Sequence, residues 1–532
     1  MGATGTDFAA FLVGSLIVSV VQPSLSANRS LVVREPHSLS PAALIAVSSI
    51  EFLLLGGAIL VSLIGIVQDV DVSPWVTVVA PFLLVAAMAW GCIHAIRTDR
   101  VNAWAPLLWW RLAMMAYSGV GSLLPYFGTP ETRGYVDAFF QTFPLDVVKY
   151  NLVSAVFALV VLIVVRVIAA PRTRRTAQSW TLGVERSALS TVEFGVLAIL
   201  AALPIRFFNS ILPLATGQPS ILPNAVSLLE MLSSVGCALL IAHYLEQRSK
   251  KLWLVIALVA AEAFLGLMVF AKVSFLLPIV MASLGALYQN PTMRRVLFLG
   301  GVVTILYMTS TPLVSYGRAM DATESGSIQP TFGRSIGHLT SYRPGIDTTA
   351  ETENVQYSWS RIAYYNAGSF AINQYDRGIP GNTLRDIDVV LIPRILYPDK
   401  PEITEISREF NVMATGNDQS FSNPGIPSEG YWIAGWWGVI GYAIAMGFVY
   451  CVWSIYAIRV VQTQAWHLLF VVLLGVRVAT RIDGMFVSDF FPMVFYAIAA
   501  HFAASFANRL ITRRAVFGVG GRMRTPHARS TG

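Results

Sequence analysis

The chain has 532 residues, of which 55% are hydrophobic and only 13% are charged, and its mean hydropathy is +0.61. This composition excludes an ordinary soluble domain and predicts a membrane protein that crosses the bilayer many times. The formal net charge is +7, but the basic residues lie in short segments between apolar runs, which is typical of membrane topology and not of nucleic-acid binding. The three cysteines lie within apolar runs and indicate neither a disulfide framework nor a metal site.

The apolar runs predict about 13 transmembrane helices in an all-α fold. No basic segment precedes the first run, so we interpret it as a transmembrane helix and not as a signal peptide. The apolar stretch 252–288 is too long for one crossing at about 1.5 Å per residue, and Lys272 interrupts it, so it predicts two helices joined by a tight turn. The expected spans are 8–21, 42–67, 76–96, 103–127, 152–170, 192–208, 226–244, two within 252–288, 297–314, 436–458, 467–478 and 490–506.

The spans divide the chain into a first helix bundle (1–314), a large polar loop (315–431), a second bundle (432–508) and a basic tail (509–532). If the arginine-rich connections face the cytoplasm, successive connections alternate between the two sides of the membrane without conflict over all 13 crossings. The N-terminus and the large loop are then outside the cytoplasm, and the tail is cytoplasmic. A periplasmic or extracellular loop has no access to ATP, so a donor substrate there must carry its own activation.

The large loop contains eight arginines, one lysine and fourteen acidic residues, and a loop of this size is where chemistry is expected. Segments 358–375 and 383–396 intersperse apolar and polar residues in a helical pattern. They predict two short amphipathic helices that lie on the membrane surface or cap the bundle. Two prolines flank Asp399 and Lys400 and hold this charged pair in a stiff turn.

Three segments carry a resemblance to a known family. LIPRILYPDKP at 391–401, followed by a flexible Gly/Asn/Ser segment and by SEGYWIAGWWG at 428–438, resembles bacterial O-antigen and exopolysaccharide repeat-unit polymerases (Wzy-type) and the related O-antigen ligases. VFAKVSFLLPIV at 269–280 is similar to the short basic turn that precedes a helix in such proteins.

The resemblance implies an integral glycosyltransferase of the C-type superfamily (GT-C) in the bacterial inner membrane. Such an enzyme moves a glycan from a polyprenyl pyrophosphate carrier onto a sugar hydroxyl of another lipid-linked repeat unit. The implied substrates are therefore lipid-linked oligosaccharides in the bilayer. A chain-length regulator and a flippase are the candidate protein partners.

The implied reaction favours particular residue types. Departure of a pyrophosphate develops negative charge, which arginine and lysine stabilise, and a carboxylate can orient or deprotonate the acceptor hydroxyl. No cluster of carboxylates or histidines suggests a metal, and no cofactor is expected. The candidate catalytic residues are Glu429, Arg394 and Lys400, and the candidates for binding the substrate or its pyrophosphate are Lys272, Arg206, Arg318, Arg361, Asp399 and Tyr431.

Several candidates also have a structural interpretation. Lys272 and Arg206 could anchor at the lipid headgroups, Arg361 could form an ion pair within the loop, and the aromatic residues beside Tyr431 could form an interfacial belt instead of stacking on sugars. Ionisable residues in or near apolar runs are expected to face the bundle interior and to pair. These are Glu51, Arg111, Arg477, Arg481, Asp483 and Asp489.

Other functions remain open at this point. An O-antigen ligase would differ from a polymerase only in its acceptor, which nothing in the sequence identifies. A transporter or flippase for lipid-linked oligosaccharides would also carry intramembrane charges, but we find no internal repeat, and alternating access does not need one large loop. A non-catalytic scaffold for polysaccharide export is a third possibility, and the basic and aromatic residues of the loop favour the enzyme over it.

Overall fold

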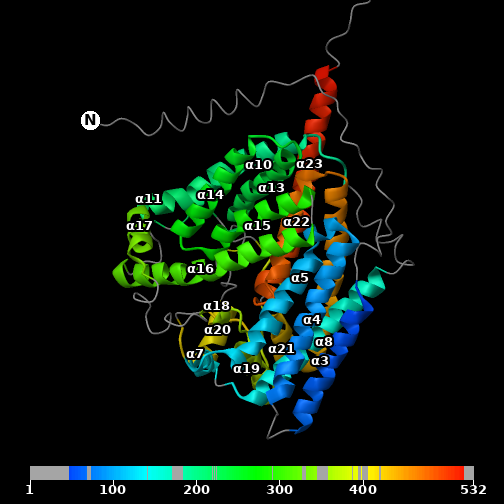
Figure 1. Cartoon of the computed structure of the whole chain (residues 1–532), viewed down its shortest axis with the longest axis vertical. Helices are drawn as coiled ribbons and strands as arrows, with labels where there is room; N and C mark the ends of the chain where they lie inside the picture. The colour runs from blue at the N-terminus through cyan, green and yellow to red at the C-terminus, as the bar shows by residue number, and fades with distance from the viewer. Residues whose placement is uncertain are drawn as a thin grey trace, which may run out of the picture. The chain divides into compact units, whose positions relative to one another are not determined.

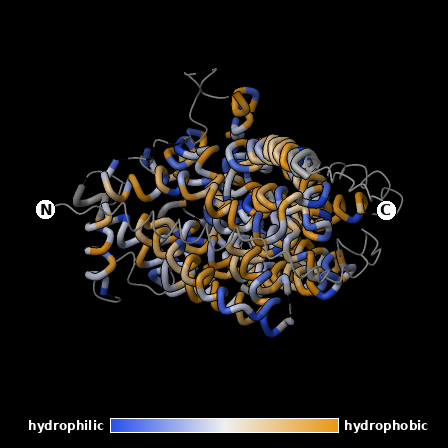
Figure 2. Tube along the Cα trace, turned by 90° about the horizontal axis from the view of Figure 1, so that it is seen from above, coloured by the Kyte–Doolittle hydropathy of each residue, from blue (hydrophilic) through white to orange (hydrophobic). Residues whose placement is uncertain are grey.

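The computed structural model describes residues 47–68, 74–140, 142–169, 184–218, 220, 222, 224–289, 292–325, 331–343, 357–385, 387–392, 397, 405–418 and 421–519. Within these ranges the regular structure is entirely helical, and hydrophobic residues run along the helices (Figure 2). Eight helices there are long and apolar enough to cross a membrane. This agrees with the predicted helical membrane protein. The expected first span, 8–21, lies outside the described residues.

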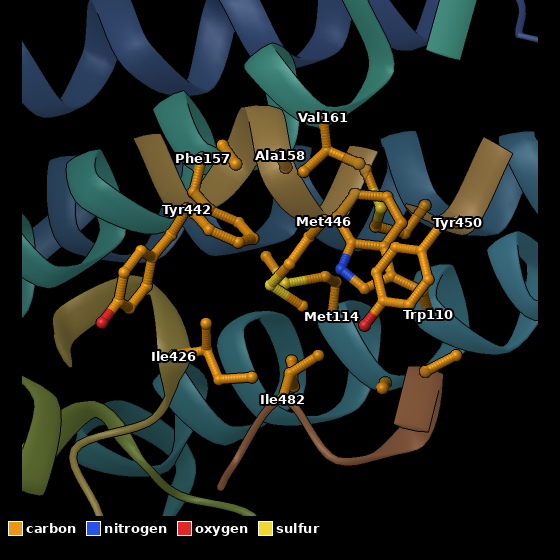
Figure 3. Packing of buried hydrophobic residues seen from close by; sticks show 14 of the residues in the cluster. Trp110, Met114, Phe157, Ala158, Val161, Ile426, Tyr442, Met446, Tyr450 and Ile482 are labelled. Carbon is orange, nitrogen blue, oxygen red and sulfur yellow. The ribbon is translucent and has the colours of Figure 1, made fainter. Parts of the chain in front are cut away.

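One group of helices forms the main core. Its four long members are α3 (Ser49–Gln68), α4 (Pro74–Thr98), α8 (Pro144–Ile168) and α21 (Ile426–Gln462), which run side by side (Figure 1). The shorter α5 (Pro106–Met114) and α22 (Leu469–Thr480) pack against them. Trp110, Phe157, Met446 and Tyr450 meet between these helices (Figure 3), so burial of large apolar side chains stabilises this packing.

A second group follows in the chain. It contains α10 (Thr191–Arg206), α13 (Met231–Glu246), α14 (Leu252–Met268), α15 (Lys272–Gln289) and α16 (Met293–Ser325). Helix α14 ends just before residues 269–271 and α15 begins just after them, which confirms the break predicted at Lys272. The C-terminal helices are α22 and α23 (Phe491–Val519), and α23 is preceded by the π-helix η8 (Phe486–Phe490).

The run predicted as a span at 103–127 is not one regular helix. After α5 the backbone forms a π-helix, η3 (Met115–Val120), then a short 3-10 turn, η4 (Gly121–Leu123), and then α6 (Leu124–Phe127). π-Helical insertions rotate the side chains that follow them and often occur at functional sites. Here the insertion carries Tyr117, which contacts the candidate site described below. The remaining short helices before α16 are η2 (Arg100–Trp104), α7 (Pro130–Phe140), η5 (Phe207–Ile211), α11 (Leu212–Thr216), α12 (Asn224–Ser227) and η6 (Leu228–Glu230).

The large polar loop contains more helix than expected. Helix α16 continues to Ser325 and α21 already begins at Ile426, so the connection is shorter than 315–431. Between them lie α17 (Phe332–Ser341), α18 (Tyr357–Ser360), α19 (Tyr365–Asp376) and α20 (Glu405–Thr415), and later in the chain η7 (Trp466–Leu468) precedes α22. The helix predicted at 358–375 is therefore present, but a turn at 361–364 divides it.

The second amphipathic helix predicted in this loop is wrong over its described residues. Residues 383–385 and 387–392 form turns. The Thr383 hydroxyl donates a hydrogen bond to the Glu429 carboxylate. Ile392 precedes a proline, and a residue in that position disfavours helical backbone. Long-range hydrogen bonding and the proline thus override the local helical pattern.

The loop packs onto the bundle through its own apolar cluster. Ala371 of α19, Phe410 of α20, Trp432 of α21 and Met485 are all buried in it. Helix α19 lies against both α8 and α21, and Ser369 donates a hydrogen bond to the Asp146 carbonyl at the start of α8. The loop is therefore a folded cap of the helix ends and not a simple connector.

A buried ion pair joins the first helices. The Arg111 guanidinium lies 3.0 Å from the Glu51 carboxylate, and the side chains are 1% and 0% exposed. This confirms the expectation that these two residues pair in the interior. Gly91 of α4 lies directly against the pair, because a Cβ there would collide with the Glu51 carboxylate and lie 2.7 Å from Arg111 Nε.

We expect Gly91→Ala to lower the free energy of unfolding by about 1–3 kcal/mol, because the added methyl group must displace the ion pair. Gly56→Ala is the matched control. Gly56 is an exposed glycine of α3 with nothing within 4 Å of a Cβ, so alanine should be neutral or stabilise by up to about 1 kcal/mol. Unfolding in mixed detergent micelles measures both values, and equal effects of the two substitutions would contradict the close packing at Gly91.

Candidate functional site

The turn between α14 and α15 is held by two other segments of the chain. Arg318 Nε donates to the Phe270 carbonyl (2.8 Å), and the Ser335 hydroxyl donates to the Met268 carbonyl (2.7 Å). Both carbonyls lie at the C-terminal end of α14, where a helix leaves acceptors without intrahelical partners. The ring of Phe270, which has a positive φ of 47°, packs so closely on Gly317 that a Cβ there would collide with it. The turn therefore has a defined position, and Lys272 follows it as the first residue of α15.

Three basic side chains gather at this turn. Arg318 and Arg361 both lie within electrostatic range of Lys272, although the three residues come from α15, α16 and the turn before α19. Lys272 is partly buried, and both arginines are exposed. The N-terminus of α15 adds the positive end of its helix dipole. We call Lys272, Arg318 and Arg361 the cation cluster; its potential favours a multivalent anion such as a pyrophosphate.

A tyrosine connects the cation cluster to a carboxylate. The Tyr364 hydroxyl lies 3.3 Å from Asp483 Oδ2 and donates a hydrogen bond to it, and Tyr364 lies within electrostatic range of Arg361. Burial, together with the nearby Asp483 charge, raises the pKa of Tyr364 well above its ordinary value, so the phenol keeps its proton and acts as the donor. The ring of Tyr117 packs edge-on against that of Tyr364, with 5.4 Å between the centroids.

Asp483 has the properties of a group that exchanges protons near neutral pH. Burial raises the pKa of Asp483 to about 6, and Asp489 adds to the rise, whereas the Arg481 guanidinium acts in the opposite direction. Arg481 itself is paired with Asp489 at 2.5 Å. A carboxyl group with such a pKa, next to a cluster of cations, is a candidate acid or base. The sequence presents Asp483 only as one of several ionisable residues beside apolar runs and does not single it out.

Glu429, which the sequence suggested as the base, has a different position. Its side chain is 0% exposed, the Thr383 hydroxyl donates to one carboxylate oxygen (2.5 Å), and the Phe486 backbone N–H donates to the other (2.7 Å). A general base must reach the hydroxyl that it deprotonates. The enclosed carboxylate, with both oxygens engaged, does not meet this condition in the structure, and its contacts support a structural role for Glu429; its catalytic role stays a prediction.

Arg206 is also engaged elsewhere. It forms ion pairs with Glu230 (3.0 Å) and Glu262 (3.1 Å), and its side chain is 11% exposed. Asn209 donates to Glu230 and Ser233 to Glu262. The residue therefore belongs to a hydrogen-bonded network among α10, η5, η6, α13 and α14, and its predicted role at the pyrophosphate does not fit this arrangement.

The other predicted residues lie away from the cation cluster or outside the described chain. Tyr431 contacts Asp376 at the far end of α19, where its hydroxyl donates to Asp376 Oδ1 (3.1 Å). Arg394, Asp399 and Lys400 fall outside the described residues. The structure thus brings together Lys272, Arg318 and Arg361 from the predicted set and adds Tyr364 and Asp483.

Comparison with known proteins adds nothing to these observations. No family model, no curated protein and no solved structure matches this chain. Within the part of the chain that the structure describes, no group of three or more His, Cys, Asp or Glu side chains could hold a metal ion. The candidate site is therefore defined by its own geometry and by the sequence resemblance.

The raised pKa of Asp483 predicts a pH dependence of stability. Its ordinary pKa is 3.8 and its pKa in the folded protein is about 6, so the contribution of this group is fully present below pH 3.8 and is lost as the pH rises through 6. We expect Asp483→Asn to reduce the decline in stability between about pH 4 and 6. Thermal unfolding in detergent at a series of pH values measures the decline in stability. Asp388→Asn is the control, because it removes one carboxylate from an exposed position. A decline as steep in Asp483→Asn as in the wild-type protein would contradict the assignment.

Proposed function

We propose that this chain is a membrane glycosyltransferase that polymerises polyprenyl-pyrophosphate-linked oligosaccharide repeat units into a surface polysaccharide. The observation that carries the proposal is the convergence of Lys272, Arg318 and Arg361 at the N-terminus of α15, beside Tyr364 and Asp483. The resemblance of segments 269–280, 391–401 and 428–438 to repeat-unit polymerases supports it independently.

The proposed setting is the bacterial inner membrane, with 13 crossings and a GT-C architecture. The N-terminus and the loop between α16 and α21 are outside the cytoplasm, and the C-terminal tail is cytoplasmic. The eight long apolar helices, together with the shorter apolar segments 252–268, 272–288 and 466–480, support a bundle with many crossings. In this topology the cation cluster is at the outer face, where a lipid-linked repeat unit presents its pyrophosphate.

The chemistry follows from the charges. The acceptor hydroxyl oxygen attacks the anomeric carbon of the donor glycan, and the bond between that carbon and the pyrophosphate oxygen breaks. The bonding electrons leave with the polyprenyl pyrophosphate, and the cation cluster stabilises the negative charge that develops on it. The hydroxyl proton passes to the Asp483 carboxylate, which Tyr364 holds in place. The pyrophosphate leaving group supplies the driving force, so ATP is not required.

Two other functions use the same lipid. An O-antigen ligase would perform the same displacement on a different acceptor, and a flippase would bind the pyrophosphate without breaking a bond. Asp483 favours the enzymes, since transport of the lipid needs no group that accepts a proton from a sugar hydroxyl. The products of the reaction distinguish the polymerase, the ligase and the flippase from one another.

The first test is a reconstituted assay. Protein in liposomes receives polyprenyl-pyrophosphate-linked repeat units from the host, and the products are resolved on a gel. We expect a ladder of polymers without ATP, and we expect Lys272→Ala and Arg361→Ala to lower its rate by about 100-fold, because each removes a charge that stabilises the leaving group.

The matched control is Arg385→Ala. Arg385 lies in the same loop but pairs with Glu409 at the surface, where an ion pair contributes little, so its removal should leave the rate within a factor of about three. If Lys272→Ala and Arg361→Ala still form the ladder at the wild-type rate, the cation cluster does not stabilise the leaving group. Movement of the lipid across the liposome membrane without any product would overturn the enzyme in favour of the flippase.

The rate should also depend on the protonation of Asp483. A base must be ionised, so we expect kcat/KM to rise with pH up to about 6 and then to level off. Asp483→Asn should lower kcat by about 100-fold or more and abolish this rise. Initial rates measured between about pH 5 and 8, a range that brackets the pKa of Asp483, determine both effects. An unchanged pH profile in Asp483→Asn would exclude this residue as the base.

A further inference from the structure

Aromatic side chains gather at the C-terminal end of α19. Tyr375 of α19, Tyr431 of α21 and Trp436 of α21 form a continuous row, with 5.4 Å between the centroids of each neighbouring pair and nearly perpendicular rings. Trp436 is 39% exposed and both tyrosines are partly exposed. The row therefore offers partly exposed aromatic rings at the edge of the folded loop.

A carboxylate lies beside this row. The Tyr431 hydroxyl donates to Asp376 Oδ1 (3.1 Å), and Lys149 Nζ donates to Asp376 Oδ2 (2.8 Å). Each oxygen has one donor, and a carboxylate has about four acceptor positions. Because the Asp376 side chain is 33% exposed, it can accept further hydrogen bonds from a ligand. Its position is set by a residue from α8 and a residue from α21.

A break in α21 creates this arrangement. The backbone leaves the helical conformation at Ala434 and Gly435, and Gly435 has a positive φ of 58°. In an unbroken helix, residues 431 and 436 would project about 140° apart around the axis, so Trp436 would face away from Tyr431. Gly435 also lies against the Tyr375 ring, 2.9 Å from where a Cβ would be. Glycine is thus required both for the backbone conformation and for the contact that completes the row.

We propose that Tyr375, Asp376, Tyr431 and Trp436 form a binding subsite for a sugar ring of the glycan chain. The C–H face of a sugar ring packs on flat aromatic side chains, while its hydroxyl groups donate to a fixed carboxylate. We call these four residues the sugar platform. The inference rests on the proposed function and deepens it, because it defines which part of a lipid-linked oligosaccharide the chain recognises beyond the pyrophosphate.

The geometry of α19 sets which sugar is bound. Arg361 and Tyr364 precede the first residue of this helix, and the sugar platform begins at Tyr375. Ten residues of helix span about 15 Å, so the platform and the cation cluster are separated by several sugar rings. The platform therefore recognises a sugar well along the repeat unit and not the one attached to the pyrophosphate. It makes binding depend on glycan length.

A membrane-interface belt is the competing explanation for the aromatic residues. An anchor of this kind has no need for the Lys149 and Asp376 pair, and it would involve the more exposed Trp437, which is 82% exposed. Trp437 is next to Trp436 but belongs to no ring contact of the platform. It is therefore the matched control that separates sugar binding from anchoring.

The test measures binding of three lipids to the full-length protein in nanodiscs. The probes are bare polyprenyl pyrophosphate, the same lipid carrying one N-acetylhexosamine, and the host's full lipid-linked repeat unit. We expect the full repeat to bind about tenfold more tightly than the other two. Asp376→Asn and Trp436→Ala should abolish this preference and leave the affinity for bare lipid unchanged, which also shows that these variants are folded. Trp437→Ala should retain the preference.

The outcomes distinguish this inference from the proposed function. Equal affinity of the wild-type protein for all three lipids would overturn the sugar platform, and so would equal losses in Trp436→Ala and Trp437→Ala, which indicate anchoring. Lys272→Ala should weaken binding of all three lipids. If it has no effect while the preference for the full repeat remains, the pyrophosphate site fails and the sugar platform stands.

Discussion

The enclosed Glu429 carboxylate is the interaction on which the candidate site depends. A buried carboxylate is tolerated only where donors satisfy it, and here the donors come from Thr383 of the loop and from the backbone at Phe486. These contacts join the folded loop, the first turn of α21 and the start of η8. The turn that carries Asp483 lies just before Phe486, so the same contacts hold Asp483 against Tyr364. In the proposed mechanism, Glu429 therefore positions the site and Asp483 accepts the proton.

The cation cluster depends on a second structural requirement, the buried carbonyls of Met268 and Phe270 at and just after the end of α14, which need donors from elsewhere in the chain. Arg318 satisfies the Phe270 carbonyl and brings its charge to the first residue of α15. One side chain thus stabilises the turn and contributes to the potential that favours an anion. Because the Phe270 ring fills the space over Gly317, the end of α16 cannot move away from this turn without losing the contact. The fold and the proposed anion site are coupled at this point.

Helix α19 relates the two parts of the proposed substrate site. Its N-terminal end follows the turn of Arg361 and Tyr364, and its C-terminal end carries Tyr375 and Asp376. The helical rise per residue fixes the distance between its ends, and packing between α8 and α21 fixes the position of the helix. A rigid separation of this kind suits a substrate with charge at one end and sugar rings further along.

The sequence by itself determined the helical membrane class, the break at Lys272 and the expectation that Glu51 and Arg111 face the interior and pair, but not with which partner. Each of these follows from the length of an apolar run or from the cost of a charge within it, which are local properties. Lys272, Arg318 and Arg361 were also predicted as binding residues, but only as separate candidates.

Only the tertiary structure decided which charged residues are enclosed and which come together. Glu429 and Arg206 have the residue types that the chemistry requires, yet their partners come from distant segments and engage them completely. The helix predicted at 383–396 was wrong for a related reason, since Thr383 bonds to a residue 46 positions away. Asp483 emerged as the candidate base because its pKa depends on burial and on neighbouring charges. Burial and long-range contacts arise only when the chain is folded, so no local pattern could have assigned these roles.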